Sequence, residues 1–127
     1  MNEPPEIEVA FAEFAPEIRR QLMAARDLIL EEGASAEGVE AVSVTLKWGQ
    51  PSYAPQPKTG TPIRLGVTKG GAPALFVHCG TSLIEDWLAL AGPDAPHEGR
   101  RAALIGPEGP EPLRLLVRAA LTCHRRR

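Results

Sequence analysis

Two large aromatic residues, Trp48 and Tyr53, stand five positions apart in a chain whose aromatic content is only 5%. Each side chain offers a broad apolar face with one polar atom, which suits the stacking of a flat or apolar ligand. Gln50 would add an amide that orients this ligand, and Pro51 favours an extended conformation at Gln50. The segment therefore predicts a pocket for a small molecule or a partner segment, with contacts from Trp48, Gln50, Pro51 and Tyr53 and from the more distant His78.

A structural role is the alternative interpretation of the same segment. Trp48 would close the hydrophobic core at the end of a strand, and Pro51 would shape the corner that follows. The two roles are compatible, because a corner rigid enough to close a core also forms a preorganised wall.

His78 and Cys79 suggest a different chemistry, that of a cysteine-dependent enzyme. The pair precedes Gly80-Thr81-Ser82, where a helix is expected to begin, and a thiol near a helix N-terminus ionises more readily. However, neighbouring residues of a strand point to opposite faces of the sheet, so His78 is badly placed to activate Cys79. The pattern favours a buried Cys79 beneath an exposed His78. A non-catalytic protein is therefore the preferred interpretation, with a cysteine-dependent enzyme as the alternative.

Glutamates are frequent in the first forty residues, and carboxylate oxygens are ligands that iron, magnesium and calcium accept. The hypothesis that follows is an iron-binding site formed by Glu13, Glu17, Glu31 and Glu32. No two histidines stand at metal-ligand spacing, and no acidic loop has the order of an EF-hand. Solvated glutamates on helix surfaces are the alternative, in which case no cofactor is required.

The elements that must position these residues begin with two helices. Apolar residues recur at helical spacing over residues 7–14 and again over 16–33, where a proline begins the helix and a glycine ends it. Residues 42–46 alternate between apolar and polar side chains, which predicts a half-buried strand that leads to Trp48. Residues 49–61 contain three prolines, so they are predicted to form a loop.

The remaining elements complete an α+β pattern. Two alternating runs, 63–67 and 74–79, flank Gly70-Gly71, which is the signature of a β-hairpin. A helix capped by Thr81 or Ser82, a short strand over 102–105 and a last helix from about residue 111 to 121 follow. The order ααβββαβα predicts an antiparallel sheet of about four strands that helices cover on one face.

The composition predicts one folded domain over residues 1–127, with a frayed tail at 1–5 and a basic end at 122–127. No apolar run approaches the roughly 20 residues of a membrane span, and the acidic start is unlike a signal peptide. A cytoplasmic protein is therefore expected, with Cys79 and Cys123 as free thiols.

Charge is distributed unevenly around a net value of −2. Residues 1–40 hold ten acids and three bases, whereas residues 41–127 hold six acids and eleven bases. Complementarity between the two regions is the simplest interpretation, and separate surfaces for different partners are the alternative. No basic cluster alternates with aromatic residues, so nucleic acid is not expected as a partner. An exposed edge strand would allow a homodimer.

The order of these features resembles the YdhG-like domain family of unknown function. The resemblance spans about residues 7 to 121 and rests on Pro16-Glu17, a long helix that ends near Glu31-Glu32, Phe76-Val77-His78 and, most specifically, Lys47-Trp48-Gly49-Gln50-Pro51-Ser52-Tyr53. It implies a compact bacterial α+β domain with no established general activity. Some members are described as frataxin-like iron chaperones, in which an acidic helical region handles iron.

Overall fold

The structure, a computed structural model, describes residues 4–77, 82–92, 94–99 and 101–124. The helices of this part are α1 (Pro5–Ala12), α2 (Pro16–Ser35), α3 (Leu83–Ala91), the 3-10 helix η1 (Glu111–Leu113) and α4 (Arg114–Thr122). Its strands are β1 (Ala41–Lys47), β2 (Gln50–Gln56), β3 (Ile63–Val67), β4 (Pro73–Val77), β5 (His97–Glu98) and β6 (Ala102–Leu104). None of the described helices combines the length and the apolar character needed to span a bilayer.

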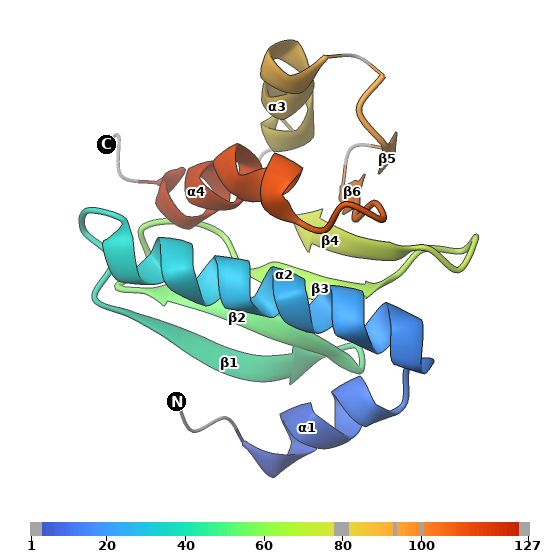
Figure 1. The fold of residues 1–127 in the computed structure, drawn as a ribbon. Coiled ribbons are helices and arrows are strands. Elements are labelled where there is room, and N and C mark those ends of the chain that lie inside the picture. Colours follow the sequence, from blue (N-terminus) through green and yellow to red (C-terminus); the bar gives the residue numbers. More distant parts are fainter. Residues whose placement is uncertain (1–3, 78–81, 93, 100, 125–127) are drawn as a thin grey trace.

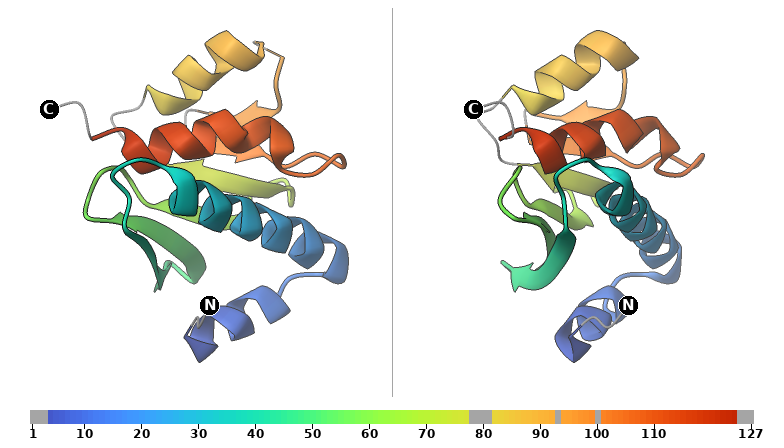
Figure 2. Two further views of the ribbon diagram at one scale, coloured as in Figure 1. Left: turned by 60° about the vertical axis from the view of Figure 1, so that its left-hand side comes forward. Right: turned by 90° about the vertical axis from the view of Figure 1, so that its left-hand side faces the viewer.

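The strands form one sheet in the order β1-β2-β3-β4-β6-β5, and every neighbouring pair is antiparallel. Helices α2 and α4 lie across one face of this sheet, and α1 extends their layer beside β1 and β2 (Figure 1). Helix α3 packs against α4, and the side views in Figure 2 show the sheet and its helices as successive layers. The predicted α+β fold, an antiparallel sheet packed against helices, is confirmed.

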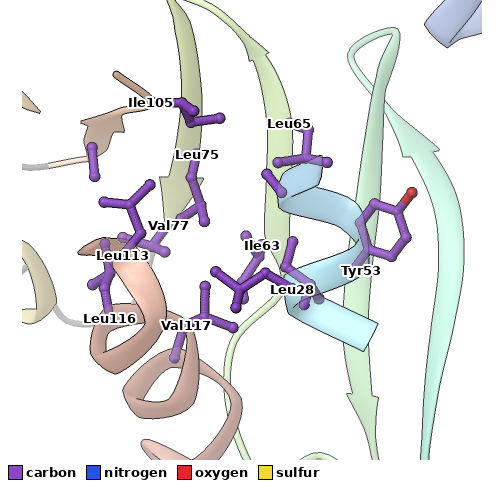
Figure 3. Close-up of a cluster of buried hydrophobic side chains, with 14 of the residues drawn as sticks. Leu28, Tyr53, Ile63, Leu65, Leu75, Val77, Ile105, Leu113, Leu116 and Val117 are labelled. Atoms are coloured by element: carbon purple, nitrogen blue, oxygen red, sulfur yellow. The ribbon is translucent and has the colours of Figure 1, made fainter. Parts of the chain in front are cut away.

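The hydrophobic core lies between the sheet and the helices. Side chains alternate along each strand, so Tyr53 and Ile63 point toward the helices while Ser52 and Arg64 point away from them. Each apolar side chain that is fully buried here stabilises the fold by about 1.5–3 kcal/mol. The core members labelled in Figure 3 are Leu28, Tyr53, Ile63, Leu65, Leu75, Val77, Ile105, Leu113, Leu116 and Val117.

Strand β2 lies where the sequence predicts a loop, and the prediction is wrong because it treats every proline as a strand breaker. The two-residue turn makes Lys47 and Gln50 a hydrogen-bonded pair of β1 and β2. From Gln50 onward, every second residue of β2 is therefore hydrogen-bonded to β1. Pro51 and Pro55 occupy the other positions, and their nitrogens point away from β1. On that side β3 pairs with β2 at only two positions, so neither proline has to donate a ladder hydrogen bond.

Strand β5 is the second element that the sequence prediction lacks. It comprises only His97 and Glu98, both exposed, and pairs with β6 at one edge of the sheet. Two exposed polar residues offer no alternation by which a strand is recognised. The sheet of the described chain therefore has six strands in place of the predicted four or so.

A buried carboxylate joins α2 to α4. Glu32 is 2% exposed, and its two oxygens accept hydrogen bonds from Arg118 Nε at 2.8 Å and from Arg114 Nη1 at 2.5 Å. Arg114 also pairs with Glu31 and Glu111. Arg118 first, and then Arg114, hold the pKa of the Glu32 carboxyl below its ordinary value, against burial, which raises it. Glu32 therefore acts as a structural link between the two helices that cover the sheet.

Candidate ligand-binding site

A two-residue turn, Trp48-Gly49, connects β1 to β2. Both residues have positive φ, 56° and 75°, as a type I′ hairpin turn requires. Glycine adopts this conformation freely, whereas a residue with a Cβ does so at a cost of about 1–2 kcal/mol. Trp48 is 89% exposed, so burial of the indole does not offset the cost. This exposure excludes the interpretation in which Trp48 closes the core.

A surface cavity of about 390 Å³ opens beside this turn. It lies on the face of the sheet opposite to α2 and α4, because Ser52 and Arg64, which are partners across β2 and β3, point away from the core. The cavity is within the range of roughly 300–1,000 Å³ that is typical of small-molecule sites. The residues that line it are Lys47, Trp48, Ser52, Thr61, Pro62, Arg64 and Arg101.

The wall that contains Thr61 is fixed to the end of α4. The Thr61 backbone N–H donates to the Ala120 carbonyl at 2.8 Å, and the Thr59 hydroxyl donates to the Leu121 carbonyl at 2.8 Å. These bonds satisfy carbonyls that the last turn of a helix leaves without an intrahelical partner. Gly60 is needed between the two threonines, because a Cβ there would collide with the Ala120 carbonyl. These two hydrogen bonds and the close approach at Gly60 fix the wall against the end of α4.

Contacts on two sides position Arg64. Its Nη1 donates a long hydrogen bond of 3.4 Å to Gln50 Oε1, and its guanidinium lies 5.7 Å from the centroid of the Phe76 ring. Phe76 is the partner of Arg64 across β3 and β4, so the sheet register itself creates this cation–π contact. The Gln50 amide passes over Gly66, where a Cβ would collide with it. A glycine in β3 therefore makes room for the side chain that supports Arg64.

The lining of the cavity is positively charged. Lys47, Arg64 and Arg101 contribute three cations, and none of the described lining residues is acidic. Ser52 and Thr61, 2% and 4% exposed, add hydroxyl groups. Ammonium, guanidinium and hydroxyl groups donate hydrogen bonds to anions. The described lining therefore offers several hydrogen-bond donors of positive charge to an anionic group.

The structure divides the predicted contact residues between the two faces of the sheet. Trp48 lines the cavity, and Gln50 supports the arginine in its lining. Pro51 is buried in β2, and Tyr53 is 0% exposed within the core. The predicted wall that combines Trp48 with Tyr53 is therefore not formed, because residues 52 and 53 face opposite sides of one strand.

Two predicted residues, His78 and Cys79, lie outside the described part of the chain, so the cysteine-enzyme hypothesis stays a prediction. Sequence reasoning also missed lining residues. For Arg64 a signal exists, since it alternates with the apolar residues of β3 and must face away from the core. For Thr61 and Arg101 the sequence carries no such signal, because only the sheet topology brings them to the cavity.

The four glutamates of the iron hypothesis do not come together. Glu17 and Glu31 lie near opposite ends of α2, about 21 Å apart at a rise of 1.5 Å per residue. Glu17 pairs with Arg20, and Glu32 is buried against its arginines. Glu13 is at the C-terminal end of α1. In the residues that the structure describes, no three His, Cys, Asp or Glu side chains form a group that would hold a metal ion.

No protein-family model, curated protein or solved structure matches this chain. The resemblance to the YdhG-like domain family therefore stays a prediction. The cavity beside Trp48 has to be interpreted from its own geometry and charge.

Proposed function

We propose that this chain is a non-catalytic binding domain that holds a small molecule in the cavity beside Trp48. One observation carries the proposal: a large aromatic side chain, 89% exposed, occupies a turn position that is unfavourable for it and lines a cavity of ligand size. Residues that are held in strained conformations cluster at binding and catalytic sites. Trp48 is such a residue.

The elements around the cavity support this function because they are ordered without a ligand. Arg64 is held by Gln50 and Phe76, and Thr61 is bonded to the end of α4. A site whose side chains are already positioned loses little conformational freedom when a ligand binds. We include in the proposal that the chain is a cytoplasmic member of the YdhG-like family, whose most specific segment contains Trp48.

The two tryptophans of the chain provide the test. In a ¹H–¹⁵N spectrum, each indole N–H gives its own signal. Trp48 lines the cavity, whereas Trp87 is 4% exposed and its Nε1 donates to the Pro112 carbonyl at 3.2 Å. We expect a true ligand from a metabolite library to shift the Trp48 signal and to leave the Trp87 signal in place.

The variant Trp48→Ala assigns the signal and should abolish binding of any compound found in this way. A library in which no compound shifts the Trp48 signal would contradict a small-molecule site. If a peptide library gives the shift that metabolites do not, the cavity holds a segment of a partner protein, which contradicts the small-molecule proposal in the same assay.

A further inference from the structure

We infer that the ligand of this cavity is a small anion, a carboxylate or a phosphate monoester, that carries a flat apolar part. The inference rests on the proposed function, because it concerns the same site. Lys47, Arg64 and Arg101 are the charged residues of the lining, and no described lining residue is an acid. The cavity therefore selects a negative group, and Trp48 offers an aromatic face to the remainder of the ligand.

Arg64 is the best placed anchor for the negative group. Its guanidinium presents donors in a planar fork that matches two oxygens of a carboxylate or a phosphate. The long hydrogen bond to Gln50 and the contact with the Phe76 ring favour one orientation of this side chain in the free protein. Lys47 at the end of β1 and Arg101, which directly precedes β6, bring further positive charge from two other segments.

The cations of the cavity lie on the side of the sheet that the helices leave open (Figure 1). Helices α1 and α2 carry the acids Glu6, Glu8, Glu17, Asp27, Glu31 and Glu32. The arginines of α2 and α4 pair with several of these acids and largely offset their charge. The preference for an anion therefore rests on the three cations that line the cavity.

The size of the cavity limits the ligand to a small molecule. About 390 Å³ accommodates one or two rings with one anionic group, and the polar residues Ser52 and Thr61 also lie in the lining. Carboxylates and phosphate monoesters share the oxygens that a guanidinium binds, so the two sources have to be separated by experiment.

Pairs of probes that differ only in charge, or nearly so, test the inference. Benzoate against benzamide is the carboxylate arm, and adenosine monophosphate against adenosine is the phosphate arm. Titrations are followed by the Trp48 indole signal, with Trp87 as the internal reference. We expect the anion of at least one pair to bind about tenfold more tightly than its neutral partner, as charge-assisted hydrogen bonds imply.

Charge-neutralising variants identify the groups responsible. Arg64→Gln and Arg101→Gln should each weaken binding of the anion by roughly tenfold and leave the neutral partner unaffected. Arg20→Gln is the matched control, because it removes the same charge from an exposed position on α2. We expect this control to change binding less than about twofold, since exposed charges on another face are screened.

The outcomes separate the two proposals. If the neutral member of each pair binds as tightly as the anion, or if Arg64→Gln and Arg20→Gln weaken the anion equally, the ligand class is wrong while binding at Trp48 stands. If no member of either pair and no metabolite shifts the Trp48 signal, both the ligand class and the proposed function are wrong.

Discussion

The carboxylate of Glu32 on α2 meets the guanidinium of Arg118 on α4 at 2.8 Å, although Glu32 itself is only 2% exposed. Arg114 binds the second oxygen of the same carboxylate. Two arginines that reach the solvent thus neutralise one buried acid between the helices that cover the sheet. Such an acid makes the stability of the fold depend on pH.

Acid should destabilise the wild-type protein through Glu32. Its pKa is lowered in the folded state, so its contribution is fully present above the ordinary value of 4.5 and is lost as pH falls through the folded pKa. Glu32→Gln should lower the free energy of unfolding at neutral pH by about 1.5–3 kcal/mol, the range for hydrogen bonds to charged groups. Urea unfolding at pH 7 and pH 3 measures the difference between wild type and variant, which should shrink at pH 3.

Glu17→Gln is the control for this experiment, because Glu17 forms an exposed pair with Arg20 one turn away on α2. Its effect at either pH should be small. If the free energies of unfolding of wild type and Glu32→Gln differ by the same amount at pH 7 and at pH 3, the charge of the carboxylate is not what stabilises the fold.

Replacement of Trp48 should stabilise the protein while it removes the site. Asparagine adopts the positive φ of 56° at this turn position more readily than tryptophan does. We expect Trp48→Asn to raise the free energy of unfolding by about 1 kcal/mol, which corresponds to roughly 3–5 °C in Tm for a domain of this size. Thermal unfolding followed by circular dichroism measures it. A Tm below that of wild type would mean that the indole makes stabilising contacts in the folded protein.

Gly66→Ala should weaken ligand binding through Gln50. A Cβ at residue 66 collides with the Gln50 amide, which must then move away from Arg64. Because the colliding atoms end a flexible side chain, the stability cost should stay below about 1 kcal/mol, whereas affinity for an anion should fall several-fold. Titration of the Trp48 signal with the anionic probe and urea unfolding measure the two effects.

A double mutant shows whether the effect of Gly66→Ala passes through Gln50. In the background of Gln50→Ala, the added methyl group has nothing to displace, so Gly66→Ala should have little further effect on affinity. Gly70→Ala is the matched glycine control, because a Cβ there meets only Thr68 Oγ1, at 3.8 Å. If the losses of affinity from Gly66→Ala and Gln50→Ala add up in the double mutant, the effect of Gly66→Ala does not pass through Gln50.

Collisional quenching should reveal the charge of the cavity without any ligand. Iodide should quench Trp48 more strongly than caesium does, because the potential of Lys47, Arg64 and Arg101 concentrates anions, roughly two- to threefold for a potential near kT. Trp87 is shielded from both ions by burial. The difference should decrease in about 1 M salt, where the Debye length is about 3 Å.

Variants supply the check on this quenching experiment. Arg64→Gln with Arg101→Gln should reduce the ratio of iodide to caesium quenching, whereas Arg20→Gln should not. Equal ratios in wild type and in the double variant would show that the cations near Trp48 create no local excess of anions.

The fold is predictable from sequence wherever apolar residues repeat with a regular period. Leu22, Ala25 and Ile29 predict the buried face of α2, and the structure confirms it. Glu32 continues the same three- and four-residue spacing, so its position indicates burial although its residue type suggests exposure. Strand β2 is not predicted for a related reason. Proline is a residue type that rarely occurs in strands, yet Pro51 occupies a position of β2 at which no backbone N–H has to donate a hydrogen bond to β1.

Less of the site is predictable, because a cavity on a sheet is assembled across strands. Trp48 and its glycine neighbour identify the turn, and Arg64 follows from the alternation of β3. Arg101, by contrast, stands 53 positions after Trp48 and reaches the cavity only because β6 pairs beside β4. Tyr53 was expected with Trp48 because the two are close in sequence, yet Tyr53 points into the core while its strand neighbour Ser52 lines the cavity.

The short pairing between β2 and β3 has a dynamic consequence. Pro51 and Pro55 flank the two residue pairs that join β2 to β3, so few backbone hydrogen bonds hold the hairpin of β1 and β2 to the rest of the sheet, and we expect this junction to open locally. The amides of the hairpin should exchange with solvent by local opening, earlier than those of β3 and β4. Lys47 and Trp48 belong to this hairpin and Arg64 to β3, so the same few contacts between β2 and β3 hold the two sides of the cavity together.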